Sequence, residues 1–251
     1  MKKSFIGLLA SILILSFTHC KKDTIPEPHE VANIAVQMNF NHLVDHFPVE
    51  MDTMKYINAN SDTFSIRTIK YFISRVTFHR DSKTDVILKD MHYIDQGIPE
   101  SLTHIFNDKI PEDTYSTVSF TFGFTHTDNK SNMFTTAPVM QMFWPENMGG
   151  GYHYQKLEGR YLDNGIKKFF NFHAGGLDKV DYSIQVKLPN SNFQVKSAQI
   201  QMDLNMEIQN WFRNPIHWDF SYFGAAIMQN HEAQQTIQKN GQDVFTATIH
   251  P

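Results

Sequence analysis

Residues 115–126, YSTVSFTFGFTH, alternate large apolar side chains with small polar ones at a period of two. The large apolar positions lie on one side of an extended chain: Val118, Phe120, Phe122 and Phe124. Such alternation is typical of a β-strand with one buried face. A phenylalanine stripe at this spacing is more often the core of a β-sandwich than a ligand-stacking surface.

Comparable β-type segments recur along the chain, at residues 32–40, 63–78, 86–94, 180–188, 193–206 and 243–251. The length of the 63–78 segment predicts a strand with a bulge. Residues 228–239 are the most helix-prone segment and are followed by Asn240-Gly241, and residues 208–218 are predicted to form a short helix or an irregular turn. We therefore predict an all-β fold, an antiparallel β-sandwich with one short helix near the C-terminus. No internal repeat is present, so residues 33–251 are predicted to form one domain.

The N-terminus has the pattern of an export signal. Lys2 and Lys3 precede an apolar stretch, residues 5–17, that is too short to span a bilayer as a helix. Cys20 is the only cysteine and is followed by Lys-Lys-Asp, so we predict a signal peptide at residues 1–19 and lipidation of Cys20. The alternative is a chance cysteine after a cleaved secretory signal, because residues 17–19 are a poor lipobox. Residues 20–32 would tether the domain to the outer membrane of the cell envelope.

Several functions are predicted to be absent. Lipidation of Cys20 leaves no thiol for a disulfide, a metal site or a nucleophile. The formal net charge is −4 and the charges are spread out, so no nucleic-acid partner is predicted. The common catalytic motifs are missing, and His79 is interpreted as a solvent-side histidine with no acid or nucleophile nearby. We therefore do not expect an enzyme.

Residues 140–176, MQMFWPENMGGGYHYQKLEGRYLDNGIKKFFNFHAGG, hold two alternating segments around the turn signal Asp163-Asn164-Gly165. This pattern predicts a β-hairpin. If the two strands pair about the turn, His153 and His173 can lie on one face, within reach of one ion or ligand.

The segments FWPENMGGGYHYQKLEGRY and FFNFHAGG resemble the central signature of the MbnP family. YFISRVTF, LKDMHYID, IPEDTYSTVSFTFGFTHTDN and AAIMQNHEAQQTIQKNGQDVF fit in order, so the resemblance extends from about Val36 to Phe245. These bacterial exported proteins are related to the copper-binding CorA and MopE proteins of methane oxidisers. The resemblance implies a β-rich exported domain that binds copper through histidines. It also implies a tryptophan oxidised to kynurenine with the help of a haem peroxidase-type partner.

The predicted metal ligands are His153 and His173, with His42 as the third ligand and Trp144 beside the ion. Copper is the expected metal and zinc is the alternative, since imidazole suits both. Two other interpretations stay open: the pair hydrogen-bonds within an aromatic cluster, and His42 caps a strand end. Tyr152 or Asn171 is expected to hold the ligand rings. Weaker histidine candidates are His126, His217 and His231.

Two functional hypotheses follow. The first is a lipid-anchored envelope protein that binds a copper ion through histidines for copper uptake, storage or delivery. The second is a β-sandwich lipoprotein without metal, which binds a partner or ligand in a pocket walled by Trp144, Tyr152 and Tyr154.

Overall fold

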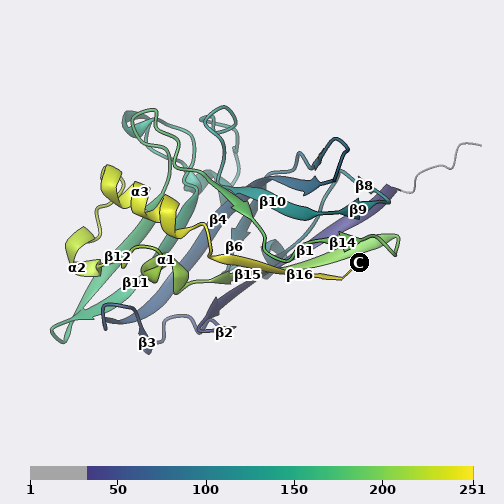
Figure 1. The fold of residues 1–251 in the computed structure, drawn as a ribbon. Helices are drawn as coiled ribbons and strands as arrows, with labels where there is room; N and C mark the ends of the chain where they lie inside the picture. Colours follow the sequence, from purple (N-terminus) through teal and green to yellow (C-terminus); the bar gives the residue numbers. More distant parts are fainter. Residues whose placement is uncertain (1–32, 251) are drawn as a thin grey trace, which may run out of the picture. The chain divides into compact units, whose positions relative to one another are not determined.

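The structure, a computed structural model, describes residues 33–250 (Figure 1). The predicted signal peptide, the lipidation site Cys20 and the tether lie outside these residues, as does Pro251. By their internal contacts the described residues form one compact unit. Among the described residues, no helix has both the length and the apolar character that crossing a membrane requires.

The larger of the two main sheets has eight strands and is built around β4. Its strands are β3 (Tyr56–Ile57), β4 (Thr63–His79), β5 (Val86–Ile87), β6 (His92–Asp95), β10 (Thr117–Phe122), β11 (Gln155–Asp163), β12 (Ile166–Ala174) and β13 (Ile184–Lys187). β11 and β10 pair with successive parts of β4, and both pairings contain a register shift. The bulge predicted for the long 63–78 segment is therefore confirmed. All pairings in this sheet are antiparallel.

The smaller main sheet has six strands around β1: β1 (Asn33–Val44), β2 (Phe47–Pro48), β7 (Thr103–Ile105), β8 (Ile110–Pro111), β15 (Gln199–Glu207) and β16 (Phe245–His250). β1 pairs with β15 in parallel, from Ala35 opposite Gln199 to Leu43 opposite Glu207, whereas its other pairings are antiparallel. A parallel pair needs a long crossover, and here the whole larger sheet lies between the two strands in sequence. A two-stranded ribbon joins β9 (Thr114–Tyr115) to β14 (Phe193–Gln194).

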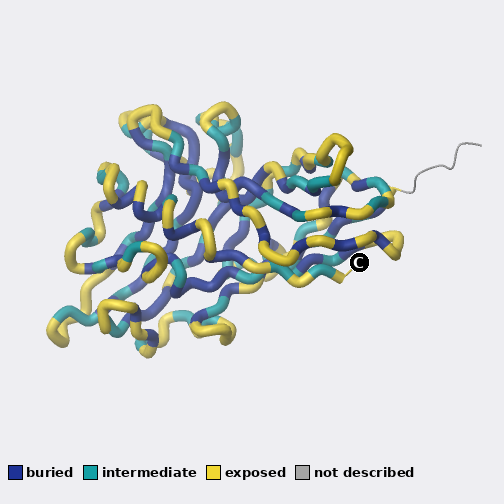
Figure 2. The backbone as a smooth tube through the Cα atoms, in the orientation of Figure 1, coloured by how far each residue is buried: buried dark blue, intermediate teal, exposed yellow. Residues whose placement is uncertain are grey.

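The two main sheets pack face to face through aromatic side chains. Phe245 of β16 lies 5.2 Å from Phe120 and 5.5 Å from Phe122 of β10, between ring centres. Phe40 of β1 reaches His92 of β6 at 5.2 Å. Figure 2 shows buried positions running along the central strands and exposed ones gathered at the loops. The predicted all-β sandwich with its antiparallel sheets is confirmed, with β1–β15 as the one parallel pair among the pairs described.

Three short α-helices lie near the β11–β12 hairpin (Figure 1): α1 (Asn210–Arg213), α2 (Phe220–Phe223) and α3 (His231–Asn240). α3 is the predicted C-terminal helix, and the Asn230 side chain caps it by accepting from the Ala233 backbone N–H at 3.1 Å. Phe220 stacks on Phe170 of β12 with ring centres 4.4 Å apart. The segment around α1 and α2 therefore covers the inner face of the hairpin. The chain also has 3-10 turns at Pro99–Leu102, Val139–Met142 and Glu146–Met148.

The outer face of the larger sheet is covered by the loop between β10 and β11. Phe134 from this loop stacks on Phe72 of β4 at 5.4 Å with planes 11° apart. Phe124, expected on the face of Phe122, instead packs on Phe72 at 4.6 Å. β10 ends at Phe122, and Gly123 has a φ of 80° with no room for a side chain beside Tyr154. The strand alternation therefore stops one residue before Phe124.

Candidate metal centre

The predicted hairpin fixes which side of the sheet His173 occupies. β11 and β12 pair from Gln155 opposite Ala174 to Asp163 opposite Ile166, around a turn in which Asn164 and Gly165 have φ angles of 49° and 81°. Both central residues with positive φ define the type I′ turn favoured in hairpins. The hairpin prediction is therefore confirmed.

Residues directly opposite each other in an antiparallel ladder share a face. His173 is opposite Lys156, and Lys156 is opposite Lys70, so these three side chains lie on one face. Tyr71 and Gln155 are opposite each other on the other face. Tyr71 stacks on Phe122 at 5.5 Å in the core between the sheets. His173 therefore lies on the outer face of the larger sheet.

His153 reaches His173 from outside the strand. Their ring centres are 5.1 Å apart and their planes meet at 85°. A continued strand would place His153 with Gln155 on the inner face, but β11 begins only at Gln155. The backbone N–H of His153 instead donates to the Met142 carbonyl at 2.7 Å. The two histidines are therefore brought together as expected, through an irregular segment rather than through strand alternation.

The two nitrogens of His153 have different surroundings. Nδ1 lies 3.0 Å from the Met142 carbonyl oxygen, which only accepts, so Nδ1 carries the proton and donates. Nε2 then holds a lone pair, and this buried atom has no hydrogen-bond partner among the described residues. Burial lowers the pKa of His153 to about 3, and the nearby charges of Lys156 and His173 act in the same direction. His153 is therefore a neutral imidazole with one free, buried lone pair.

His173 is held from the opposite side. Its Nε2 donates to Oε1 of Glu158 at 2.8 Å, which leaves the lone pair of the neutral ring on Nδ1. Glu158 also accepts from the Thr68 hydroxyl at 2.9 Å. The hydrogen bond from His173 is the main cause that lowers the pKa of Glu158 to about 2. Each histidine thus has one nitrogen fixed by an acceptor and the other available.

The expected holding groups, Tyr152 and Asn171, are engaged elsewhere. The Tyr152 hydroxyl exchanges hydrogen bonds with the Phe134 backbone at 2.8 and 3.1 Å. The Asn171 amide donates to the Ala225 carbonyl at 3.4 Å. The Met142 carbonyl holds His153 instead, and no sequence pattern predicts this contact. The Glu158 carboxylate holds His173; Glu158 is two positions along β11 from Lys156, the residue opposite His173. Only the period-two spacing of Lys156 and Glu158 could have indicated that Glu158 shares the face of His173.

Trp144 packs beside the His153–His173 pair. Its indole meets the His153 ring edge-on, with centres 4.7 Å apart and planes at 75°. The indole lies against Gly175, where an added Cβ would come within 2.5 Å of the ring. Trp144 is 1% exposed, and its Nε1 has no partner within the described part of the chain. Trp144 is therefore beside the histidine pair, as expected.

The structure does not bring His42 to the pair. His42 lies on β1, where Nδ1 donates to Gln96 Oε1 at 2.6 Å and Nε2 accepts from the Tyr71 hydroxyl at 3.2 Å. Tyr71 points to the inner face, opposite to the face of His173. Burial lowers the pKa of His42 to about 4. His42 thus has both nitrogens occupied in the core and does not act as a strand-end cap.

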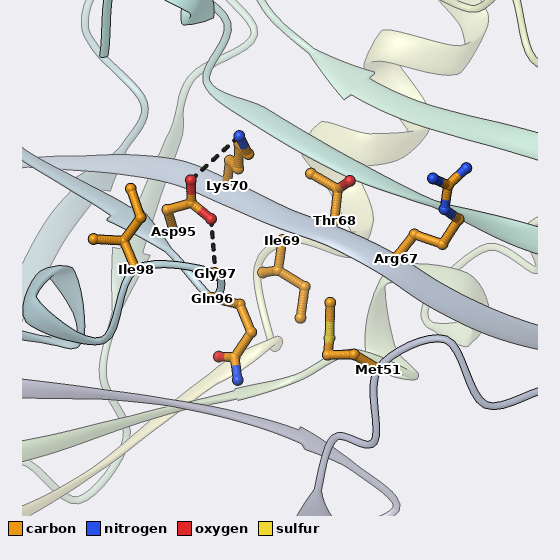
Figure 3. A pocket seen from close by; sticks show the side chains of 9 residues that line it. All are labelled: Met51, Arg67, Thr68, Ile69, Lys70, Asp95, Gln96, Gly97 and Ile98. Atoms are coloured by element: carbon orange, nitrogen blue, oxygen red, sulfur yellow. Dashed lines mark hydrogen bonds and ion pairs between the residues drawn. The ribbon is translucent and has the colours of Figure 1, made fainter. Parts of the chain in front are cut away.

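Gln96 connects His42 to a surface pocket of about 500 Å³ beside β4. Figure 3 shows its lining side chains: Met51, Arg67, Thr68, Ile69, Lys70, Asp95, Gln96, Gly97 and Ile98. Lys70 pairs with Asp95 at 3.2 Å, and Gln96 is directed away from them (Figure 3). Thr68 and Lys70 also line a smaller cavity of about 150 Å³ that reaches Met142, Lys156 and Glu158. Polar surface therefore extends up to the carboxylate that holds His173.

The weaker histidine candidates do not join the site. His126 and His217 are exposed. His231 bonds to the Tyr182 hydroxyl at 2.7 Å and to Asp178 at 3.1 Å. Within residues 33–250, no group of three or more His, Cys, Asp or Glu side chains is arranged to hold a metal. The candidate centre is therefore a two-nitrogen site.

The dimensions of the pair fit a shared ion. Two rings that bind one ion through nitrogens at about 2.0 Å have centres at most roughly 6 Å apart, and these lie 5.1 Å apart. On each ring the other nitrogen donates to an acceptor, the Met142 carbonyl for His153 and the Glu158 carboxylate for His173, which is the arrangement that orients histidine ligands in metal proteins.

The fold and site define an all-β sandwich protein with an aromatic-flanked histidine pair on the outer face of its larger sheet. The sequence profile of the MbnP family matches residues 33–230, and the chain belongs to that family. Among solved structures, the chain is similar to "MbnP from Methylosinus trichosporium", with 11% identity and a TM-score of 0.56. The match covers 88% of this chain and 100% of that chain, and at this identity it supports the shared fold alone. No curated protein matches the sequence.

Proposed function

We propose that this chain is a lipid-anchored envelope protein that binds one copper ion through His153 and His173, for copper uptake, storage or delivery. The observation that carries the proposal is Nε2 of His153, a buried lone pair without a partner in the described structure. A buried polar atom without a hydrogen bond costs about 1–3 kcal/mol. A bound ion would offset that cost.

The donor set favours copper over zinc. Zinc in structural sites takes four ligands in a tetrahedron, whereas the pair offers two imidazole nitrogens and no third His, Cys, Asp or Glu among residues 33–250. Copper(I) is stable with two donors, and imidazole suits copper. The low pKa of His153 keeps it in the neutral form that binds metal. His42 is left out of the proposed ligands because both its nitrogens are engaged.

The alternative ligand pocket has less support. Trp144, Tyr152 and Tyr154 are between 1% and 2% exposed, so they are packed side chains rather than walls of an open cavity. Tyr152 contacts Phe134 at 4.9 Å and Phe72 at 6.4 Å between ring centres. No specific observation favours a second function for these residues.

The test is the metal content of protein purified without an affinity tag and loaded with copper under reducing conditions. One equivalent is expected for the wild type and none for the His153→Ala/His173→Ala double variant. The matched control is His126→Ala/His217→Ala, which removes two exposed histidines and should keep one equivalent. Wild-type affinity in the His153/His173 variant, with an unchanged far-UV spectrum, would refute the site.

The lipid anchor is tested separately. Replacing Cys20 by Ser is expected to release the protein from the membrane fraction, because acyl chains provide the attachment. A Cys20→Ser protein that is processed normally and still stays in the membrane after a high-salt wash would contradict the anchor and leave the copper proposal unaffected.

A further inference from the structure

His79, the last residue of β4, contacts both an acid and a hydroxyl. Its Nδ1 lies 2.7 Å from Oδ2 of Asp85, and its Nε2 lies 2.7 Å from Oγ of Ser119. The sequence-based interpretation that no acid or nucleophile approaches His79 is therefore wrong. The three groups come from two strands and a loop, so no local motif could reveal them.

The sheet register explains the arrangement. His79 is opposite Thr117 on β10, and Ser119 is opposite Thr77 on β4, so His79 and Ser119 are diagonal neighbours. The register shift between β4 and β10 begins next to Ser119, and such irregularities re-aim side chains near functional sites. Asp85 is placed by the turn after β4, where its other oxygen accepts from the Arg80 backbone N–H at 3.3 Å.

The hydrogen bonds set the proton positions. A carboxylate only accepts, so Nδ1 of His79 donates to Asp85, and the lone pair of the neutral ring is on Nε2. The Ser119 hydroxyl must then donate to Nε2. This is the order of donors in a Ser-His-Asp triad, in which the imidazole takes the serine proton. The hydrogen bond from His79 lowers the pKa of Asp85, which keeps the carboxylate ionised.

A surface cavity of about 420 Å³ opens at these residues. Its lining is His79, Ser116, Thr117, Ser119, Gln185, Val186 and Lys187. Lys187 of β13 is directly opposite Ser119, so its ammonium shares the face of the hydroxyl. A cation there can stabilise the negative charge that forms on a carbonyl oxygen attacked by Ser119. The cavity can hold a small acyl compound beside the nucleophile.

We propose that Ser119 and His79 are catalytic residues, positioned by Asp85, that hydrolyse small esters in this cavity. Ser119 Oγ forms a bond to the ester carbonyl carbon while its proton moves to His79 Nε2. The ester C–O bond then breaks, and the alkoxide leaves with that proton as an alcohol. Water, deprotonated by His79, attacks the acyl-serine; the acid is released and the proton returns to Ser119. This activity is independent of copper at His153 and His173.

The experiment uses the full-length chain in detergent with a fluorophosphonate probe, which forms an Oγ–P bond with an activated serine and releases fluoride. Mass spectrometry should locate a single adduct on Ser119 in the wild type. Ser119→Ala should lose the adduct, and its rate of p-nitrophenyl acetate hydrolysis should fall at least about 10²-fold. The matched control is Ser221→Ala, at an exposed serine of α2 outside the cavity, whose hydroxyl donates to Asp219 at 2.7 Å rather than to a histidine. This control variant should keep both the adduct on Ser119 and the wild-type rate of hydrolysis.

The roles of His79 and Asp85 are separated by two further variants. His79→Gln should abolish labelling at all pH values, because no base remains for the Ser119 proton. In Asp85→Asn the labelling rate should fall but not vanish, because the amide no longer fixes the His79 ring with Nδ1 as the donor and Nε2 facing Ser119. No adduct on Ser119 in folded wild-type protein, or equal labelling in His79→Gln, would overturn the proposal.

Discussion

The imidazole of His153 stands almost perpendicular to that of His173, with ring centres 5.1 Å apart. Strand register places His173, whereas a backbone hydrogen bond to Met142 outside the strand places His153. Each ring is then fixed by an acceptor at one of its two nitrogens. The separation of the two lone pairs is therefore set by folding, before any ion arrives, which is the preorganisation that a binding site requires.

Replacing Glu158 tests this preorganisation. Glu158→Ala removes the acceptor of His173 Nε2, so the ring can rotate or exchange its proton between nitrogens. Loss of such a supporting group typically lowers metal affinity about 10–100-fold. We expect a drop of this size in competition titrations with a copper(I) chelator, at an unchanged stoichiometry of one.

Two variants sharpen the interpretation. Glu158→Gln keeps an oxygen that can accept from His173 and should lose less affinity than Glu158→Ala. Thr68→Val removes only the hydroxyl that donates to Glu158 and should have the smallest effect. Equal affinities in all three variants would show that Glu158 does not position His173.

His42 provides the test of the two-ligand set. His42→Ala should keep one equivalent of copper, because the ring is bonded to Gln96 and Tyr71 in the core. It should cost stability, since the buried Tyr71 hydroxyl loses its partner, at about 1–3 kcal/mol. Urea denaturation measures the loss. His46→Ala, at a side chain that is 86% exposed, is the control and should change little. If His42→Ala loses the bound copper while His46→Ala keeps it, His42 is a ligand.

The sequence predicted the strands because alternation reports which face of a strand is buried. Within residues 115–126 the alternation matches β10, Thr117–Phe122, and ends where Gly123 has a positive φ, whereas Tyr115 belongs to the separate strand β9. Alternation does not report which strands become neighbours. The parallel pairing of β1 with β15 joins the beginning of the domain to its last third, and no local signal indicates it.

The candidate site was predictable only in part, for the same reason. The turn at Asn164 and Gly165 places His173 beside the start of β11. The backbone hydrogen bond to Met142 that directs His153 toward it has no signal in the sequence. Glu158 contacts His173 because of the cross-strand register. His42 bonds to Tyr71 in the core because one sheet packs on the other. Ser119, His79 and Asp85 meet through register and a turn. These are tertiary relationships, which residue types and spacing in one sequence do not encode directly.

The pH dependence of stability should reveal the buried His42. Its pKa is lowered to about 4 in the folded protein, against about 6.5 when unfolded. Between these values the unfolded state binds a proton that the folded state does not, so stability falls as pH falls through this window. His42→Gln removes one such proton. The slope of unfolding free energy against pH, between about 4.5 and 6, should decrease by on the order of 1 kcal/mol per pH unit. Equal slopes would mean that His42 titrates normally when folded.

Two adjacent glycines provide a matched test of how Trp144 is seated. A Cβ on Gly175 would lie 2.5 Å from the Trp144 ring, whereas a Cβ on Gly176 would meet its nearest atom, the Tyr154 hydroxyl oxygen, at 3.4 Å. Gly175→Ala must therefore displace the indole, and overpacking of this kind costs about 1–3 kcal/mol. Because Trp144 borders His153 at 4.7 Å, we also expect weaker copper binding and a shifted tryptophan emission spectrum. Gly176→Ala should leave both near wild type. If the two variants have the same stability and copper affinity, the close contact between Gly175 and Trp144 does not fix the position of the indole beside His153.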